Sequence, residues 1–380
     1  MSFSRRVLHG AWLALLFATL TSCQSKPLNG CDICESATTC ETATTGPASG
    51  VDAGDASSCM VPGFIYYGTR DLVISVAWSP VDDYVLSGAD GEVRLLQAHE
   101  DSGTLSDLDV YTGQGGRTFV AWSADGKFAL SAAKDVRLLD ISRQTASISD
   151  VATFSGHVGD IYAVSVAPDN AHALSAGEDS TLRLLDVDVA SATLTELTRF
   201  DAQAGKIYGL SWSPDGKYAA TAGEDGTARL FSVDTTEPAL REVAHVTRSE
   251  WVVAVDWSAR DGDWLVGTWG KCNAVQLLAP DPQASSIRLE DTFLGHTSGA
   301  RTAHFRADGA YAVTAGHDDT VRLFARAVGS PKLEPVAFLP NNRFGVHDTS
   351  FSPDGKVLLV AASHVDQLTW VDISACVGSP

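Results

Sequence analysis

Short apolar runs that alternate with polar residues cover most of the chain, and tight turns separate them. The stretch 211–231, SWSPDGKYAATAGEDGTARLF, shows the pattern in full. Trp212 ends one strand, and the sequence PDG at 214–216 supplies a turn, because Pro presets φ and Gly accepts a positive φ. Residues 218–222 form a second strand, and a second hairpin turn, EDG, leads into a third strand at 228–231. A single unit of this kind cannot bury both of its faces.

This unit recurs along the chain, and the recurrence determines the expected fold. The residue that ends the first strand of each unit is Trp78, Trp122, Val166, Trp212, Trp257, Phe305 or Phe351, at spacings of 44 to 48 residues. A period of roughly 40 to 50 residues that carries four short strands is typical of a β-propeller. The sequence therefore predicts an all-β, seven-bladed propeller over residues 61–376.

Several motifs within the repeats resemble those of the WD-repeat family. They are Gly156-His157 and Gly295-His296 before the first strand, Ser175 and Thr314 in the second strand, Asp179 and Asp318 in the next turn, and Trp370-Val371-Asp372 in the last repeat. Five repeats lack the Gly-His pair, and the signature Trp is replaced at Leu96, Leu139, Leu185, Phe231, Leu278 and Phe324. The complete His-Ser-Asp-Trp hydrogen-bond network of the family is therefore not expected, and the resemblance rests on the sevenfold repetition.

The order of the strands indicates how the ring closes. In the WD-repeat plan, a sequence repeat begins with the outermost strand of the preceding blade. Here a strand at 63–67 precedes the first anchor, whereas the last repeat contributes strands at 345–351, 356–361 and 368–373 and none after them. The N-terminal strand is therefore expected to complete the seventh blade, which removes an open sheet edge.

Two cysteines flank the strands that would close the ring. Cys59 lies four residues before Gly63, and Cys376 lies three residues after Ile373. In neighbouring antiparallel strands, the start of one strand lies beside the end of the other. The two thiols should therefore lie within bonding distance, and the sequence predicts a Cys59–Cys376 disulfide. The alternative is that Cys59 pairs within the N-terminal tail. The pairing of Cys31, Cys34, Cys40 and Cys272 is left open.

Residues 1–22 have the features of a lipoprotein signal peptide. An Arg pair at 5–6 precedes an apolar run, 7–20, that is too short to span a bilayer. The run ends in the sequence LTSC, which resembles a bacterial lipobox, so Cys23 is expected to be the lipidated N-terminus of the mature chain. By resemblance to Gram-negative lipoproteins, Gln24 favours the outer membrane, on its periplasmic or its surface side. Ordinary secretion with an incidental Cys23 is the alternative.

Residues 23–60 differ in composition from the repeats. They are rich in Ser, Thr, Ala, Gly and Asp and poor in apolar residues, so they are expected to be a disordered tether. The pair Cys31 and Cys34 has neither a second such pair nor a His within the tail, which favours disulfides over zinc. A short tail, 377–380, follows the propeller.

The charge balance limits the class of partner. The chain has 27 basic and 47 acidic side chains, and removal of Arg5 and Arg6 with the signal would move its net charge from −20 to −22. An acidic surface opposes binding to nucleic acid and to anionic membranes. Membrane attachment is therefore expected through the lipid anchor alone.

The sequence shows no catalytic motif, and it predicts no catalytic residue, no metal and no cofactor. Asp-rich turns such as 261–263 are interpreted as turn caps rather than calcium ligands, because they recur at the same hairpin. A recurring Arg is interpreted as structural, packed between blades with its head on carboxylates or carbonyls. It is found as Arg94, Arg137, Arg183, Arg229 and Arg322.

Two classes of function remain open. The favoured one is a non-enzymatic platform for protein–protein interaction at the outer membrane, with a partner that the sequence does not identify. The alternative is an extracytoplasmic propeller enzyme of the lactonase, hydrolase or quinone-dependent dehydrogenase type, which would gather carboxylates, histidines or a metal in the channel. The residues four before each anchor form a mixed ring unlike a metal site, namely Ile74, Thr118, Tyr162, Tyr208, Val253, Arg301 and His347.

By resemblance, the family binds partners on the face that carries the connections between blades and the connections between the second and third strands of each blade. The matching positions include Asp160, Glu178, Lys206, Glu224, Trp251, Lys271 and His317, with Trp269 near Trp251 in the repeat order. Two tryptophans on one sector would anchor a partner, since buried aromatic residues dominate interface energies. The alternative is that both pack between blades.

Overall fold

The computed structural model describes residues 59–68, 72–201, 203–340, 345–362 and 367–377. The expected signal peptide (1–22), the expected lipidation site Cys23 and nearly all of the expected tether (23–60) lie outside these residues. So do Cys31, Cys34 and Cys40. Within the described ranges no helix has the length and apolar character needed to cross a membrane.

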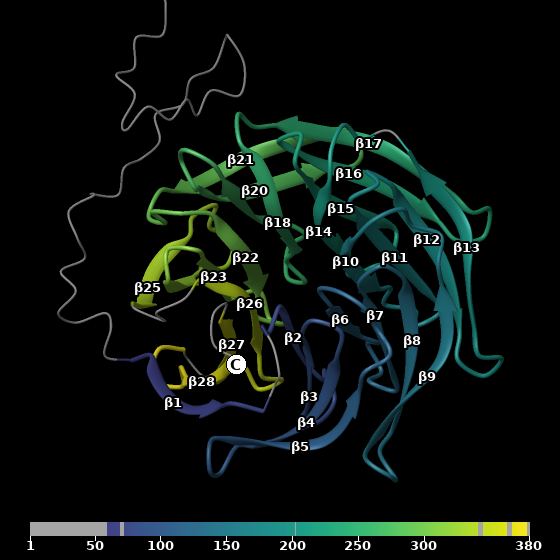
Figure 1. Ribbon diagram of the computed structural model, residues 1–380. Coiled ribbons are helices and arrows are strands. Elements are labelled where there is room, and N and C mark those ends of the chain that lie inside the picture. Colours follow the sequence, from purple (N-terminus) through teal and green to yellow (C-terminus); the bar gives the residue numbers. More distant parts are fainter. Residues whose placement is uncertain (1–58, 69–71, 202, 341–344, 363–366, 378–380) are drawn as a thin grey trace, which may run out of the picture. The chain divides into compact units, whose positions relative to one another are not determined.

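The repeats form seven four-stranded antiparallel sheets around a common axis (Figure 1). From the innermost strand outwards, the first blade is β2 (Ser75–Trp78), β3 (Tyr84–Gly88), β4 (Val93–His99) and β5 (Thr104–Tyr111). The second is β6 (Phe119–Trp122), β7 (Phe128–Ala132), β8 (Val136–Ser142) and β9 (Ser147–Phe154). The third is β10 (Ile161–Val166), β11 (His172–Gly177), β12 (Leu182–Asp188) and β13 (Thr193–Phe200).

The remaining blades repeat this order. The fourth is β14 (Ile207–Trp212), β15 (Tyr218–Gly223), β16 (Thr227–Asp234) and β17 (Ala239–Thr247). The fifth is β18 (Trp251–Trp257), β19 (Trp264–Trp269), β20 (Val275–Asp281) and β21 (Ser286–Phe293). The sixth is β22 (Ala300–Phe305), β23 (Tyr311–Gly316), β24 (Val321–Ala325) and β25 (Glu334–Leu339). The seventh is β26 (Val346–Phe351), β27 (Val357–Ala362), β28 (Gln367–Asp372) and β1 (Val61–Tyr66), so the seven-bladed all-β propeller is confirmed.

Each of the seven predicted anchor residues is the last residue of an innermost strand. The turn that follows is held by side-chain caps. Ser213 Oγ donates to Asp215 Oδ1 at 2.6 Å, and Tyr218 N donates to Ser213 Oγ at 2.9 Å. Gly216 adopts φ +69°, a conformation that favours glycine. The interpretation of these aspartates as turn caps is therefore confirmed for this hairpin.

The middle strands of a blade are buried on both faces by the neighbouring blades. In β16, Leu230 and Phe231 are fully buried. Leu230 packs with Val266 of the fifth blade, whereas Phe231 packs with Leu184 of the third. Because alternate side chains of one strand reach opposite neighbours, two consecutive residues of this strand are both apolar. A large apolar residue at the signature position thus fills the space between blades.

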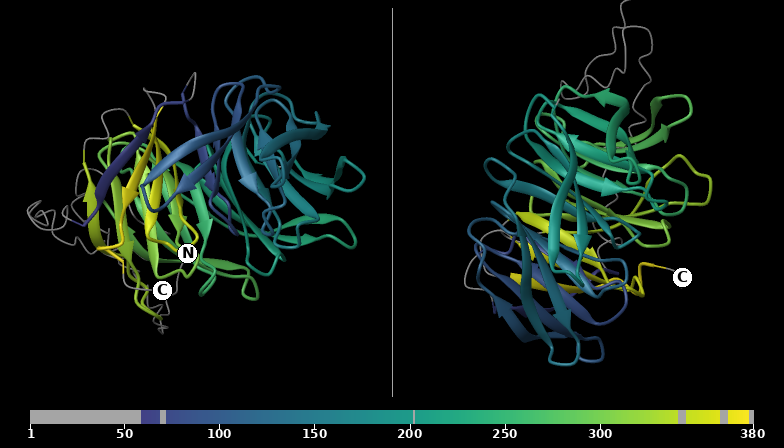
Figure 2. Two further views of the ribbon diagram at one scale, coloured as in Figure 1. Left: turned by 90° about the horizontal axis from the view of Figure 1, so that it is seen from below. Right: turned by 90° about the vertical axis from the view of Figure 1, so that its right-hand side faces the viewer.

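The N-terminal strand completes the seventh blade, as predicted, with the bounds Val61–Tyr66 rather than 63–67. It pairs antiparallel with β28, and the two strands lie side by side in Figures 1 and 2. Cys59 and Cys376 form a disulfide in which the Cα atoms are 5.1 Å apart. The predicted bond is thus present in the structure, and Cys272 is also a disulfide cysteine.

The recurring Arg lies between blades with its head on a polar partner, as predicted. Arg183 on β12 pairs with Glu196 on β13, and its guanidinium carbon lies 6.0 Å from the ring centre of Phe154 in the preceding blade. Arg94, Arg137 and Arg229 likewise pair with carboxylates. Arg322 instead donates to the Gly295 carbonyl at 2.7 Å. At Arg137 and Arg322, as at Arg183, the guanidinium also lies over an aromatic ring of the preceding blade.

Part of the WD-repeat hydrogen-bond network forms in the two blades that have the Gly-His pair. His157 Nε2 lies 2.8 Å from Ser175 Oγ, and its Nδ1 lies 3.0 Å from Asp179 Oδ2. In the sixth blade, His296 makes the corresponding contacts with Thr314 and Asp318 at 2.9 and 3.0 Å. The Trp position is apolar in both blades, so three of the four members of the network are present.

Candidate functional site

The predicted partner-binding residues lie where the innermost strands begin and the second strands end. Because these strands are antiparallel, the predicted positions meet in pairs. The pairs are Asp160 with Glu178, Lys206 with Glu224, and Trp251 with Trp269. Lys271 is exposed two residues beyond Trp269, and His317 directly follows β23. The structure therefore brings most of these residues together at one end of the inner strands.

At this end of the inner strands, the third and fourth blades carry four charged residues that we call the charged sector. They are Asp160, Glu178, Lys206 and Glu224. Lys206 Nζ donates to Glu178 Oε1 at 2.7 Å and lies 5.7 Å from the ring centre of Tyr162. The hydrogen bond with Lys206 lowers the pKa of Glu178, and the same bond raises the pKa of Lys206. Both groups therefore stay charged at neutral pH. An exposed pair of this kind adds little to stability.

Seven ring side chains form a continuous series around the axis, which we call the aromatic arc. Its members are Phe119, Tyr162, Tyr208, Trp251, Trp269, His317 and His347. The centres of successive rings are 4.7 to 6.4 Å apart, distances at which aromatic rings attract each other. Trp251 is 42% exposed. The alternative, in which both tryptophans are packed between blades, is therefore wrong, because Trp251 is not buried there.

β-Bulges direct one side chain of the innermost strand towards the axis in several blades. In five blades the pairing of the innermost strand with the second strand skips one residue, which is Tyr162, Tyr208, Val253, Arg301 or His347. A bulge turns its extra side chain out of the regular ladder. All five of these residues line one cavity. The first two blades pair without such a skip, so the ring expected four residues before each anchor forms through bulges only in blades three to seven.

The cavity has a volume of about 450 Å³ and carries few charged groups. Asp348 is the one carboxylate among the described residues that line it. Its oxygens accept hydrogen bonds from Ser75, Val76, Thr302 and Thr349 and lie 3.1 Å from His304 Nε2. Burial opposes the charged form of His304, but the hydrogen bond with Asp348 and the charge of Asp348 raise the pKa of His304 overall. The lone pairs of Asp348 are thus occupied within the protein.

Arg301 brings a positive charge into the cavity. Its Nη1 lies 3.3 Å from His317 Nε2, and no carboxylate in the described part of the chain forms an ion pair with it. Burial lowers the pKa of Arg301 to about 10, and the charge of Arg117 contributes to the same effect. The guanidinium is therefore protonated at neutral pH but lies in surroundings that oppose its charge.

Some residues of this site were missed by sequence reasoning. Phe119 lies three residues before its anchor rather than four, because the second blade has no bulge at this point. Gly299 allows a close approach, since a Cβ atom there would lie 2.6 Å from Trp269 Cγ. Arg117 follows a Gly-rich connection, where no periodic pattern marks it. The three-residue spacing between Phe119 and its anchor can be used to predict its position only once the bulges are known.

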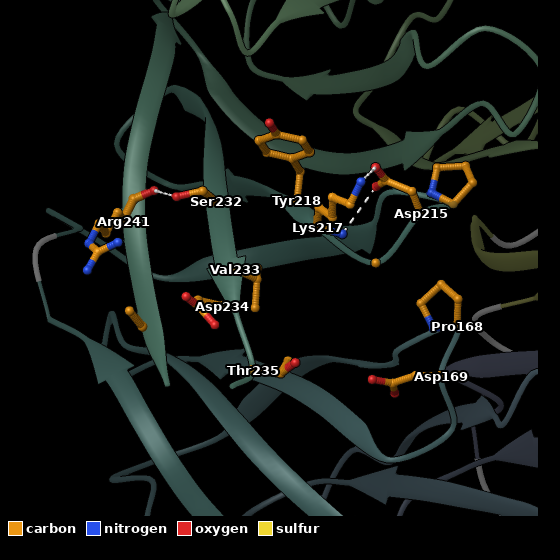
Figure 3. A pocket seen from close by; sticks show the side chains of 13 residues that line it. Pro168, Asp169, Asp215, Lys217, Tyr218, Ser232, Val233, Asp234, Thr235 and Arg241 are labelled. Atoms are coloured by element: carbon orange, nitrogen blue, oxygen red, sulfur yellow. Dashed lines mark hydrogen bonds and ion pairs between the residues drawn. The ribbon is translucent and has the colours of Figure 1, made fainter. Parts of the chain in front are cut away.

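A second cavity, of about 660 Å³, lies at the turns between strands of the third and fourth blades (Figure 3). Lys217 Nζ is 3.6 Å from Asp215, and Ser232 Oγ donates to the Arg241 carbonyl at 3.4 Å. These polar groups thus satisfy one another. Among the described residues no three His, Cys, Asp or Glu side chains are arranged to hold a metal ion. The aromatic arc is therefore the stronger candidate site.

Comparison with protein families gives one match. The family described as "WD domain, G-beta repeat" matches residues 61–96, 148–186, 194–232 and 288–324. Each match runs from the outermost strand of one blade to the third strand of the next, which is the repeat boundary expected from the sequence. The comparison with curated proteins found no match. Propellers with this repeat generally act as scaffolds for protein interaction. This chain therefore carries WD repeats in four places within a seven-bladed β-propeller.

Proposed function

We propose that this chain is a non-enzymatic platform for protein–protein interaction, with the aromatic arc and its adjoining charged sector as the binding surface. The observation that carries the proposal is the position of Trp251. Its indole is 42% exposed, and its ring centre lies 6.0 Å from that of Tyr208 with the planes 29° apart. A ring that is already held by a neighbour loses little conformational freedom on binding, and tryptophans dominate interface energies.

The charged sector beside Trp251 suits selection among partners. Glu178 and Lys206 present opposite charges side by side, and Asp160 and Glu224 lie next to them. Charges at the rim of an interface control association rate and specificity more than affinity. A partner segment with an apolar anchor and a nearby basic group fits this arrangement best.

The proposal includes a tether to the outer membrane through a lipidated Cys23. Its support is the sequence LTSC at 20–23, which follows the apolar run 7–20. The chain has a net charge of −20, which opposes attraction to an anionic membrane surface. Acyl chains on Cys23 would therefore supply the attachment.

Affinity capture with the full-length chain tests the platform. Wild type is compared with Trp251→Ala and with Phe64→Ala, which is a matched control because both side chains are 42% exposed and Phe64 lies on the outermost strand β1. We expect Trp251→Ala to lose captured partners by about tenfold or more, since a central Trp contributes about 2 kcal/mol or more. Phe64→Ala should retain them. Undiminished capture of the same partners by folded Trp251→Ala would contradict the proposal.

A further inference from the structure

Arg301 differs from most arginines of the propeller in its lack of a carboxylate partner. Arg94, Arg137, Arg183, Arg229 and Arg326 each pair with at least one Asp or Glu. No described carboxylate forms an ion pair with Arg301 or with Arg117, and both residues line the channel cavity. The two residues come from the sixth and second blades, which are not neighbours. Arg301 is partly buried and Arg117 is exposed. A partly buried cation without a counter-charge is unfavourable, which indicates a place where a ligand supplies that charge.

The rest of the cavity wall fits a planar apolar body. Tyr162, Tyr208 and Trp251 line the same cavity as Arg301 and Arg117. The ring centres of the tyrosines are 5.3 Å apart, and Tyr208 stacks on Trp251. The volume of about 450 Å³ lies within the range of small-molecule sites, roughly 300 to 1,000 Å³. The cavity thus combines cationic groups with an aromatic wall.

We propose that this cavity binds a small aromatic carboxylate, with the carboxylate at Arg301 and Arg117 and the ring against Tyr208 and Trp251. Guanidinium groups bind carboxylates through paired N–H donors, and ring contacts hold the apolar body. A free aromatic acid and the aromatic C-terminal residue of a peptide share this chemistry. The site goes beyond the proposed function, because the ligand need not be a protein.

The electrostatics of the cavity support an anion. The burial of Arg301 and the like charge of Arg117 both oppose the charged guanidinium, and they lower the pKa of Arg301 to about 10. An anion bound between the two arginines would offset both effects. Asp348 offsets these two effects on Arg301 only in part, since its oxygens accept hydrogen bonds from Ser75 and backbone N–H groups. The net charge of −20 makes a cationic cavity an exception within this chain.

Isothermal titration calorimetry of the purified full chain tests the site with three probes of one shape. They are 3-phenylpropionate, 3-phenylpropanamide and 3-phenylpropylamine, which carry a negative, a neutral and a positive end group. We expect the acid to bind about tenfold or more tightly than the amide, and the amine not to bind, because only the acid forms charge-assisted hydrogen bonds with arginine. The tripeptide Ala-Ala-Phe, with a free or an amidated C-terminus, distinguishes the two sources. Tighter binding of the free peptide than of 3-phenylpropionate indicates a chain end, and weaker binding indicates a free acid.

Substitutions locate the site. Arg301→Gln should weaken binding of 3-phenylpropionate by about tenfold or more. Arg301→Lys keeps the charge but loses the paired donors, so it should bind the acid several-fold more weakly. It replaces Arg301→Gln as the test variant if Arg301→Gln does not fold. The matched control is Arg241→Gln, an exposed arginine on β17, which should bind as wild type does.

Three results would overturn the inference. They are equal affinity for acid, amide and amine, no binding of either acid by wild type, and unchanged affinity in a folded Arg301 variant. Partner capture that persists in Arg301→Gln separates this site from the proposed protein-binding surface, whose own test is Trp251→Ala.

Discussion

The double substitution Cys59→Ala, Cys376→Ala should destabilise the propeller strongly, because the disulfide joins the two ends of the ring. The two cysteines are separated by 317 residues along the chain. In the chain-entropy model, a cross-link over so long a loop removes about 19 cal/mol/K of unfolded-state entropy, equal to about 6 kcal/mol at 25 °C. β1 remains paired with β28 from Val61 to Tyr66, so the native fold should persist in the variant. The loss of stability is thus expected to come mainly from the unfolded state.

Urea denaturation, followed by circular dichroism and by tryptophan fluorescence, measures this loss. Cys59 and Cys376 are partly buried against Met60, Ile373 and Val377, and alanine keeps part of that contact. A thiol reductant separates the effect of the cross-link from that of packing when it is added to wild type and variant alike, because it also reduces the disulfide of Cys272 in both. Under reductant, the stability of wild type should fall close to that of the variant. A loss below about 1 kcal/mol would refute the reasoning, since it would mean that closing the loop contributes little to the free energy of unfolding.

Three further results are expected. Burial raises the pKa of Asp179 and of Asp318, but hydrogen bonds and the adjacent His outweigh it and lower each pKa to about 2. Each carboxylate therefore stabilises the fold above about pH 4 and loses that contribution, up to roughly 2 kcal/mol, as the pH falls from about 4 to about 2. Acid unfolding followed by circular dichroism measures this, and an unchanged acid midpoint in Asp179→Asn, Asp318→Asn would argue against it. Phe231→Ala removes a fully buried ring between two blades and should cost about 3 to 5 kcal/mol in urea denaturation, with a loss under about 1 kcal/mol as the contrary result. Cys23→Ser should move the protein from the membrane fraction to the soluble fraction, as measured by fractionation and by the intact mass of the N-terminus. Unchanged membrane attachment would count against lipidation.

The sequence by itself determined the repeat, the number of blades and the closure of the ring. Turns such as 213–218 depend on Ser, Asp and Gly within a few residues of one another, so their positions follow from local preferences. Trp212 and the other anchors then mark the ends of the innermost strands. Once seven repeats are recognised, the N-terminal strand has one open edge to pair with, which places Cys59 beside Cys376.

Only the tertiary structure decided the composition of the channel. The sequence placed the residues four before each anchor in a ring at the channel, but it did not show how Tyr162, Tyr208 and Arg301 come to line one cavity. They do so because bulges shift the pairing by one residue and free these side chains from the regular ladder. The exposure of Trp251 could not be predicted either, since an indole at a strand end can be buried between blades or exposed to solvent. Turn and strand preferences act over a few residues, whereas the channel wall is set where innermost strands from different blades converge.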